Sequence, residues 1–480
     1  MKKFFEKHDL VKITFCMILL TVLLSWIVKQ GYFNAGELTV KEITRVGIFD
    51  FATYGLLGMY YFTVLVTFLF VLGAFYQFLS KLGAYQKLTN RISKRWKGKE
   101  IVFSLIISFV FAALASIFNE YLVLVAFMPF VITILSKLKF DKISSFVTTF
   151  GSMLIGILGS VISTKVAGMN VQYFALKYTD KLLVKIILFV LAYVIYNVFN
   201  VLYLRKSFAK NSKKADKKSK TKKDSIEEVQ YEDMFNENVK GSEKSNTIPL
   251  IIVGALAILV TVLAYIPWKS VFNVDWFTTA LTKVTETKLF GAPIFSYILG
   301  NVSEFGSWDL FGVQVVMLLA ILVLQICYKV SIDDTIDSFR EGFKKTSKLV
   351  VVLLLAYVIL EFAVMYPVIP TIVGKILGSK FNVFTTTIAG VITSLFTSEY
   401  QYTVNMLYSF FATAYPKDLN VVSFILQSTY GLVSFFAPSS AMLLVGLSYL
   451  DIPYKDWMKY IWKFLVAMLV VIIIMAFIIA

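Results

Sequence analysis

The chain has 480 residues, of which 58% are hydrophobic and only 16% are charged, and its mean hydropathy is +0.75. Soluble domains contain about 45–50% apolar and about 25% charged residues, so these values exclude a soluble enzyme. The net charge of +17 does not indicate a nucleic-acid-binding protein, because the basic residues lie in short clusters between apolar segments, as in membrane proteins. We therefore expect an all-α polytopic membrane protein.

The residues that most metal and cofactor sites require are scarce. Cys16 and Cys327 lie in apolar segments, and the single histidine, His8, lies in the N-terminal tail. This composition predicts no disulfide framework, no histidine-based metal site, no Ser-His-Asp triad and no bound cofactor. The sequence also lacks a Gly-x-x-x-x-Gly-Lys-Ser/Thr motif, so ATP-driven transport by this chain is not expected.

The first two helices follow from the placement of charge. Lysines precede the apolar run 11–28, and no small-residue cleavage site follows it. We predict a cytoplasmic N-terminus and a retained first helix rather than a signal peptide. Residues 52–79 should return, because residues 81–99 carry seven lysines and arginines and are expected inside.

Two polar residues, Asn119 and Glu120, interrupt the apolar stretch 101–136, and lysines flank both of its ends. The charge pattern predicts a re-entrant hairpin that enters from the cytoplasm and turns at this pair. Such a hairpin is tolerated only where its tip is packed in protein or lines a cavity. The alternative is two ordinary helices joined by an external loop at the same pair.

Residues 143–170 are expected to cross outward as a broken helix, and residues 182–204 to return. The break contains small and polar residues and one lysine: Gly159, Ser160, Ser163, Thr164 and Lys165. Residues 205–247 are basic in their first half and acidic in their second. This composition predicts a charged cytoplasmic linker that is solvated and largely disordered.

The second half begins with a connector crossing at 248–268 and a long external stretch. Residues 310–328 should return to the cytoplasmic side. Residues 329–348 are basic and amphipathic, so we expect them to lie along the inner membrane surface. Residues 349–366 should then cross outward.

A second hairpin is predicted at 381–414, entering from outside. Its tip has the sequence Thr397-Ser398-Glu399. Residues 419–450 should cross inward as a second broken helix, and residues 460–480 should cross outward, which leaves the C-terminus external. The second break consists of Ala437, Pro438, Ser439 and Ser440.

These elements amount to nine crossings and two hairpins. Residues 1–204 form a first repeat, and residues 248–480 form the connector helix and a second repeat. Because one connector crossing separates the two sets, the second set is inverted relative to the first. Inverted repeats with broken helices are typical of secondary transporters.

One sequence offset relates the two polar interruptions. Glu120 and Glu399 lie 279 positions apart, and the same offset matches Ser160 with Ser439. An acidic residue near the bilayer centre costs about 2.5–3.5 kcal/mol on insertion scales, so a matched pair indicates a function. Helix ends at the tips would offer carbonyls to a cation and N–H groups to an anion. Lys165 could neutralise Glu120, pair with a substrate carboxylate or reach the external surface.

Several short motifs carry a family resemblance. They are Leu-Gly-Ala-Phe at 72–75, Lys-Leu-Gly-Ala at 81–84, Ala-Pro-Ser-Ser-Ala at 437–441, Gly446-Leu447, Ile452-Pro453-Tyr454 and Trp457. These motifs resemble the signatures of YfcC-like carriers, of the C4-dicarboxylate anaerobic carrier type in the ion-transporter superfamily. The resemblance implies a homodimer in which each chain has a scaffold domain and a transport domain that moves as an elevator.

By position in that family, the substrate and ion site would include both hairpin tips and both helix breaks. Its residues would be Asn119, Glu120, Gly159, Ser160, Ser163, Thr164, Thr397, Ser398, Glu399, Ala437, Pro438, Ser439 and Ser440. The Ser-Asn-Thr tips of the related sodium-dicarboxylate symporters are absent here. Lys165 stands near the position where YfcC-like chains often have Asn-Pro. The coupling ion, Na⁺ or H⁺, is therefore left open.

The expected function is secondary active transport of a small organic solute across the cell membrane, by ion symport or exchange. Acids at both tips argue against a dianion unless protons or Na⁺ screen them, so an amino acid, basic ones included, fits best. The alternatives are a C4-dicarboxylate or acyl-amino acid carrier and, in other classes, a membrane scaffold or an intramembrane enzyme. Asn170 is expected near an outer helix end, outside the site.

Overall fold

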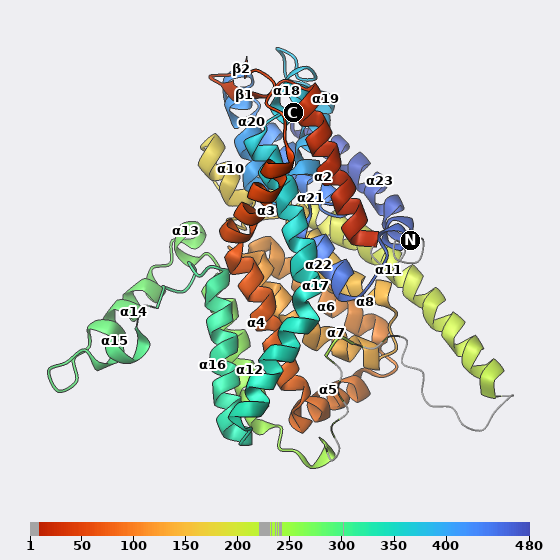
Figure 1. Ribbon diagram of the computed structural model, residues 1–480, viewed down its shortest axis with the longest axis vertical. Coiled ribbons are helices and arrows are strands. Elements are labelled where there is room, and N and C mark those ends of the chain that lie inside the picture. Colours follow the sequence, from red (N-terminus) through yellow and green to blue (C-terminus); the bar gives the residue numbers. More distant parts are fainter. Residues whose placement is uncertain are drawn as a thin grey trace.

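The computed structural model describes residues 9–219, 231, 233–235, 237, 239, 242–300 and 302–480; His8 lies outside them. Within this part of the chain, eight helices are long and apolar enough to cross a membrane (Figure 1). They are α2 (Asp9–Ile27), α4 (Thr63–Ser80), α6 (Glu100–Ile117), α11 (Leu182–Ser219), α12 (Ile248–Tyr265), α16 (Leu310–Tyr328), α17 (Ile332–Met365) and α23 (Tyr454–Ile479). The prediction of an all-α polytopic membrane protein is confirmed. The number of crossings stays a prediction, because α6 belongs to a hairpin.

The segment between the first two long helices is more irregular than predicted. β1 (Gly31–Asn34) and β2 (Glu37–Val40) form a short antiparallel hairpin, which lies near α18 (Ile369–Gly374) at one end of the molecule (Figure 1). The predicted helix 52–79 is in fact two helices. α3 (Ile48–Tyr61) and α4 meet at Phe62, whose φ of −104° and ψ of 21° interrupt the helical path.

The first predicted hairpin turns inside the protein. Its arms are α6 and the pair formed by η1 (Tyr121–Phe127) and α7 (Met128–Lys137), and α5 (Gly83–Trp96) precedes it. The tip residues Phe118 and Glu120 are 0% and 6% exposed. The turn forms because Phe118 leaves the helical conformation and the Glu120 carboxylate accepts a hydrogen bond from the Leu122 amide, which begins η1. The tip is therefore packed in protein, as a re-entrant hairpin requires, and the choice between a hairpin and two crossing helices stays a prediction.

Both predicted broken helices are present, and each lies beside its hairpin. The first consists of α8 (Lys142–Thr148), α9 (Phe150–Leu158) and, after the break, α10 (Ala167–Phe174). The second hairpin consists of α19 (Val383–Phe396) and α20 (Tyr400–Ala414), and the second broken helix of α21 (Leu419–Val433) and α22 (Ala441–Tyr449). A Cβ on Gly431 would lie 2.2 Å from the Leu158 Cα, so only glycine lets the two broken helices cross this closely.

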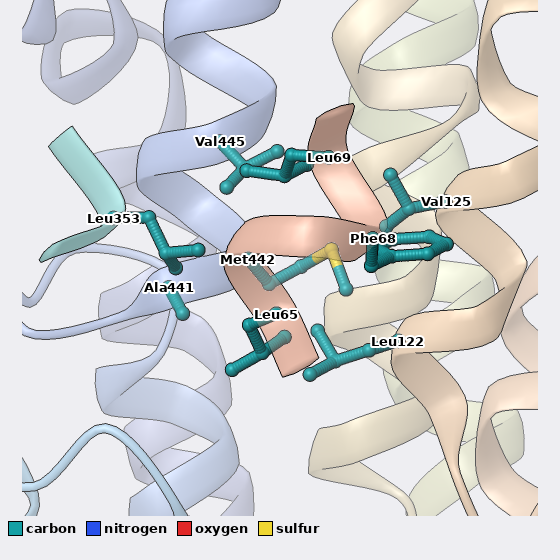
Figure 2. Close-up of a pocket in the computed structure, with 9 residues that line it drawn as sticks. All are labelled: Leu65, Phe68, Leu69, Leu122, Val125, Leu353, Ala441, Met442 and Val445. Atoms are coloured by element: carbon teal, nitrogen blue, oxygen red, sulfur yellow. The ribbon is translucent and has the colours of Figure 1, made fainter. Parts of the chain in front are cut away.

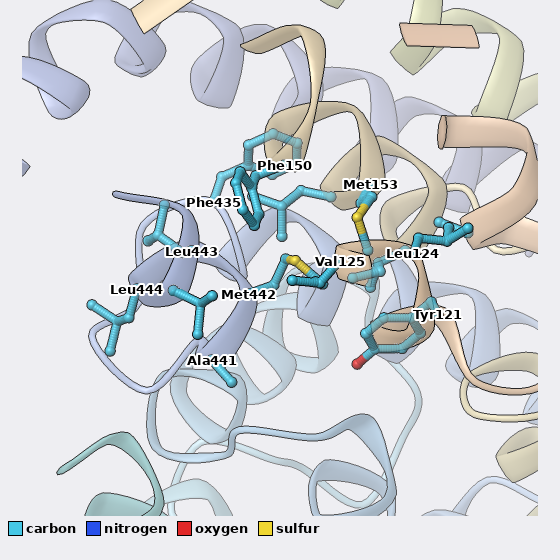
Figure 3. Close-up of a cluster of buried hydrophobic side chains, with 14 of the residues drawn as sticks. Tyr121, Leu124, Val125, Phe150, Met153, Phe435, Ala441, Met442, Leu443 and Leu444 are labelled. Carbon is cyan, nitrogen blue, oxygen red and sulfur yellow. The ribbon is translucent and has the colours of Figure 1, made fainter. Parts of the chain in front are cut away.

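These hairpins and broken helices share one apolar core. Figure 3 shows side chains of η1, α9 and α22 packed together, with Met153 and Met442 among them. Phe150 and Leu443 are completely buried. Close packing of this kind transmits displacement between neighbours rather than absorbing it, so we refer to these elements together as the hairpin unit: α6–α10 and α19–α22.

The prediction that residues 329–348 lie along the membrane surface is wrong. Residues 332–348 continue without a break into the following span as α17, a single helix of 34 residues. Thr335, Ser338 and Gly342 are buried, and a Cβ on Gly73 of α4 would lie 2.5 Å from the Gly342 carbonyl oxygen. The amphipathic pattern therefore reflects packing of α17 along α4, not a helix lying on lipid. The paired small residues permit a close helix crossing.

Part of the linker is also not solvated as predicted. Tyr231, Asp233 and Phe235 are 7%, 5% and 2% exposed. The Tyr231 hydroxyl donates a hydrogen bond to Ser145 Oγ over 2.7 Å, and the Tyr449 hydroxyl donates to Asp233 Oδ1 over 3.1 Å. Burial raises the pKa of the Asp233 carboxyl. The described linker residues thus contact the hairpin unit, and η2 (Ser242–Lys244) follows them.

The predicted external stretch forms a separate arm. It consists of α13 (Trp268–Phe272), α14 (Trp276–Glu286) and α15 (Ile294–Leu299), which extend away from the body (Figure 1). Asn119 connects this region to the first hairpin tip. Its backbone amide donates to the Tyr265 carbonyl over 2.9 Å at the end of α12.

Candidate functional site

The two hairpin tips meet at one lysine. Lys165 Nζ lies 3.1 Å from Glu120 Oε2 and 3.9 Å from Glu399 Oε2. The side chains of Glu120 and Glu399 are 8% and 19% exposed, whereas that of Lys165 is 40% exposed. Two carboxylates from opposite repeats therefore share one ammonium group, and the three groups together carry a formal charge of −1.

The first break is attached to the first tip through backbone carbonyls. The Ser116 carbonyl accepts hydrogen bonds from the amides of residues 161, 162 and 163, at 3.1–3.2 Å. The Ser163 hydroxyl donates to the Phe118 carbonyl over 2.6 Å, and the Thr164 hydroxyl donates to the Asn119 carbonyl over 3.2 Å. These bonds satisfy carbonyls that the end of α6 leaves unpaired, and they hold Lys165 beside Glu120.

The second break uses the same carbonyl positions. The Ser439 hydroxyl donates to the carbonyls of Leu395 over 2.9 Å and Thr397 over 3.4 Å. Leu395 and Thr397 follow Ser116 and Phe118 by 279 positions, the offset that relates Glu120 and Glu399. The accepting carbonyls of the two tips thus correspond at this offset, whereas the donors do not, because the counterpart of Ser439 is Ser160 and not Ser163.

Tyrosines surround the second acid. The Tyr357 hydroxyl donates to Glu399 Oε1 over 3.2 Å, and the Tyr430 hydroxyl donates to the Ser398 carbonyl over 3.0 Å. Both tyrosines line a small cavity of about 10 Å³ together with Glu399, which is about the room that one water molecule needs. This cavity is therefore too small for an organic solute, whereas Lys165, which does not line it, is 40% exposed.

Apolar side chains bound this cavity on the side of α4. Leu122, Ala441 and Met442 line both the site cavity and a neighbouring apolar cavity, which is completed by residues of α4, α17 and α22 (Figure 2). The neighbouring residues are Leu65, Phe68, Leu69, Val125, Leu353 and Val445. At this cavity the hairpin unit therefore meets α4 and α17 through apolar side chains, whereas Tyr357 of α17 donates a hydrogen bond to Glu399 beside it.

Comparison with known proteins now identifies the family. The protein-family model of the C4-dicarboxylate anaerobic carriers matches residues 8–480. The chain belongs to this family. It is accordingly a membrane carrier of the secondary-transporter type that acts on a small-molecule substrate, and not an enzyme. The resemblance found in the sequence is confirmed at the family level.

Two solved structures are similar to the carrier over most of their length. The YdaH transporter of Alcanivorax borkumensis, described as having an unusual topology, has a TM-score of 0.42 and 10% identity, with 97% of this chain and 98% of that chain covered. MtrF of Neisseria gonorrhoeae, described with a class of antimetabolite efflux pumps, has a TM-score of 0.38 and 12% identity, with 98% and 94% covered. None of the curated proteins matches.

Several residues expected in the site also hold the carrier's backbone, and one of them, Ser440, lines the cavity as well. Asn119 Nδ2 donates to the carbonyls of Gly306 over 3.1 Å and Trp308 over 3.2 Å, on the side of the arm. Gly159 gives room to α11, since a Cβ there would lie 2.5 Å from the Phe189 Cα. Ser440 caps α22 with its hydroxyl. Ala437 is buried beside these residues, and Pro438 precedes Ser439 in the same break.

A second polar network was not predicted. The Tyr400 hydroxyl donates to Asn170 Oδ1 over 2.6 Å, Asn170 Nδ2 donates to Gln427 Oε1 over 3.1 Å, and Gln427 Nε2 donates to the Ser160 carbonyl over 2.6 Å. Whether Asn170 takes part in binding stays a prediction. These hydrogen bonds link the first break and α21 to the second hairpin. Tyr400 follows Glu399 as Tyr121 follows Glu120, but this pattern does not indicate the partners of its hydroxyl.

The described residues offer no evident site for a metal ion. They contain no group of three or more His, Cys, Asp or Glu side chains that could hold one. The oxygens nearest to the centre of the site belong to Glu120 and Glu399, and Lys165 already lies against both. The chemistry that this arrangement provides is the recognition of charge, by two acids and one base where the hairpin tips meet, beside a small cavity that Glu399 lines.

Proposed function

We propose that this carrier transports an amino acid, and that basic amino acids fit its site best. The observation that supports the proposal is the ratio of charges, two carboxylates to one ammonium, within 4 Å of Lys165 Nζ. A substrate with one net positive charge brings this formal charge to zero. A dianion raises the excess negative charge, and two unit charges about 4 Å apart interact by about 4 kcal/mol at an effective dielectric of 20.

A C4-dicarboxylate is the second candidate, because the family description names this substrate class. Acyl-amino acids belong with it, since they also bring excess carboxylate. In this case Lys165 would leave one glutamate to pair with a substrate carboxylate, and protons or Na⁺ would neutralise Glu120 and Glu399. The 40% exposure of the Lys165 side chain supports such a movement.

We further propose that the hairpin unit moves as one body relative to α4, α12, α16 and α17, as in an elevator. Its internal contacts support this, because Gly431 and Gly446 press the two broken helices together. Its boundary with α4 is apolar and contains few directional bonds to break. A homodimer in the plasma membrane, with a cytoplasmic N-terminus and an external C-terminus, completes the proposal.

Uptake into proteoliposomes tests the substrate class. Vesicles with the purified carrier would be offered labelled arginine, lysine, alanine and succinate separately, under Na⁺ or proton gradients in turn. We expect uptake of the cationic amino acids and a loss of about 10-fold or more in Glu399→Gln, because a hydrogen bond to a charged group contributes about 1.5–3 kcal/mol. Glu361→Gln is the matched control, since Glu361 of α17 is also buried but does not line the cavity.

Uptake of succinate without any amino acid would overturn the amino-acid proposal and favour the dicarboxylate. Equal uptake by Glu399→Gln and the unaltered carrier would remove the acids from the site altogether.

A further inference from the structure

The cation of the site comes from one repeat only. At the offset of 279 that matches Glu120 with Glu399, the counterpart of Lys165 is Leu444, which is completely buried in α22. The repeat therefore duplicates the acid and leaves the base single. A site with two like charges and one opposite charge remains short of one cation.

Lys165 occupies the position between the acids. Both carboxylate oxygens lie within 4 Å of Nζ, so they are no further from one another than these two distances added together. An inorganic cation bound to both oxygens would have to sit at or near this point. The ammonium head is a compact charge with three donors, and two of its donors can serve the two carboxylates while the third remains free.

The lysine can leave this position without unfolding the break. Its backbone segment is fixed independently, since the amides of Val166 and Gly168 donate to the Ser163 carbonyl over 3.2 and 3.1 Å. Its side chain is 40% exposed, and four rotatable carbons connect the charge to the backbone. Movement of the head therefore changes side-chain torsions only.

A solute does not fit in the cavity next to Glu399, so binding between the two acids would require it to take the place of the exposed Lys165 head. The cavity next to Glu399 has about 10 Å³, the room of about one water molecule. An ammonium or guanidinium group that replaced the Lys165 head would keep a positive charge beside both carboxylates. Exchange of one cation for another avoids exposing an unpaired buried charge, which is the costly step in breaking a buried ion pair.

We propose that Lys165 is a tethered counter-cation, which fills the cation position of the empty site and is displaced by the cationic group of the substrate. The inference rests on the proposed function for the identity of the substrate, but not for the role of the lysine. It follows that the unaltered carrier needs no inorganic cation between Glu120 and Glu399. Removing Lys165 should create that requirement.

A measurement without substrate tests the role of the lysine. The thermal unfolding midpoint of purified carrier would be compared in NaCl and in choline chloride of equal ionic strength, at pH 8. We expect Lys165→Gln to show a midpoint that rises with Na⁺ concentration, because a ligand that binds only the folded protein stabilises it. The unaltered carrier and the double variant Glu120→Gln/Lys165→Gln should give equal midpoints in the two salts.

A second measurement uses whichever solute the unaltered carrier transports. Uptake would be measured with NaCl on both sides of the vesicle membrane and again with choline chloride on both sides. The unaltered carrier should give the same rate in the two salts, and uptake by Lys165→Gln should require Na⁺. Lys165→Arg, which keeps the charge, should remain independent of Na⁺. This charge-retaining variant, together with the unaltered carrier, keeps the test decisive if Lys165→Gln does not fold.

Two results would overturn the inference. One is a Na⁺ requirement for uptake by the unaltered carrier, with a midpoint that responds to Na⁺. The other is a folded Lys165→Gln whose midpoint ignores Na⁺ and whose KM for every carboxylate solute rises in both salts, which would make Lys165 the anchor of a carboxylate. Uptake of succinate alone would overturn the amino-acid proposal while the measurement without substrate still decides the role of Lys165.

Discussion

The acids of the two hairpin tips have different surroundings, although they lie at matching positions of the sequence. Glu120 is nearly buried and lies 3.1 Å from Lys165, with an additional bond from the Leu122 amide. Glu399 is more exposed, lies 3.9 Å from the same lysine and receives a bond from Tyr357. Lys165 is thus the close counter-ion of Glu120, and Glu399 shares the same lysine at a longer distance. The difference indicates a structural anchor at Glu120 and a reachable acid at Glu399.

Neutralising each acid in turn is the strongest test of this difference. Glu120→Gln and Glu399→Gln should each reduce uptake by about 10-fold or more, because each removes a charged interaction of about 1.5–3 kcal/mol. Glu120→Gln should also lower the unfolding midpoint further than Glu399→Gln, since it breaks the shorter and more buried ion pair. Differential scanning fluorimetry compares the midpoints. A larger drop in Glu399→Gln would reverse the two roles.

The helix contacts behind the tips should differ in the same direction. A Cβ on Gly156 of α9 would lie 2.4 Å from the Ala112 carbonyl oxygen, whereas a Cβ on Gly390 of α19 would lie 2.4 Å from the Thr429 side chain. The Ala112 carbonyl belongs to the helix backbone and cannot move away from an added methyl group, whereas the Thr429 side chain can rotate. We expect Gly156→Ala to destabilise the carrier by about 1–3 kcal/mol through overpacking, and Gly390→Ala by less. Denaturant unfolding monitored by tryptophan fluorescence measures both.

Equal losses in the two alanine variants would mean that Thr429 is held as firmly as the backbone. In that case the second repeat would be no more adaptable than the first.

The serine bonds at the breaks provide a smaller test. Ser163→Ala removes one bond to the Phe118 carbonyl, but backbone amides still serve the neighbouring Ser116 carbonyl. Ser439→Ala removes the hydroxyl that donates to both Leu395 and Thr397. We expect a loss of about 1 kcal/mol in Ser439→Ala and a smaller loss in Ser163→Ala. Unfolding midpoints at several carrier concentrations would show whether the order holds.

The smallest effect should lie away from both tips. Lys348 Nζ is 2.8 Å from Asp451 Oδ1, and its hydrogen bond lowers the pKa of the Asp451 carboxyl. A lowered pKa contributes stability above the unfolded value of about 3.9 and loses it as the pH falls through the folded value. Because the pair is exposed, Asp451→Asn should cost at most about 1 kcal/mol at pH 7. The difference should begin to shrink near pH 4 and vanish below the lowered folded pKa, which a series of melting curves would reveal.

Polar interruptions in apolar helices were the most informative part of the sequence. They located Glu120, Glu399 and both breaks, and the shared offset related the two acids to each other. The reason is physical, because a charge in lipid must have a partner and therefore stands out. One of the three roles considered for Lys165, neutralising Glu120, is the contact that the structure contains. The contact of Lys165 with Glu399 could not be predicted, because it depends on how the two hairpins pack together.

What the sequence did not predict depends on neighbours. Asn170 and Gln427 lie on helices whose facing partners are distant in sequence, so their hydrogen bonds cannot be read from periodicity. The same holds for α17, where burial against α4 and burial in lipid produce the same amphipathic pattern. Asp233 was assigned to a solvated linker because its surroundings are charged. Its partners, Thr133 and Tyr449, lie far away in the chain.

At the crossing of α4 and α17, the backbones of Gly73 and Gly342 are in contact, and the Thr346 side chain lies beside them. Sliding either helix by one residue would bring Leu72 or Phe343 into a contact that accepts only hydrogen atoms at Gly73 and Gly342. The positions of α4 and α17 along each other are consequently fixed, and the two helices form one rigid pair. A spectroscopic label on either helix would serve as an origin of coordinates, against which the displacement of every other part of the carrier can be measured.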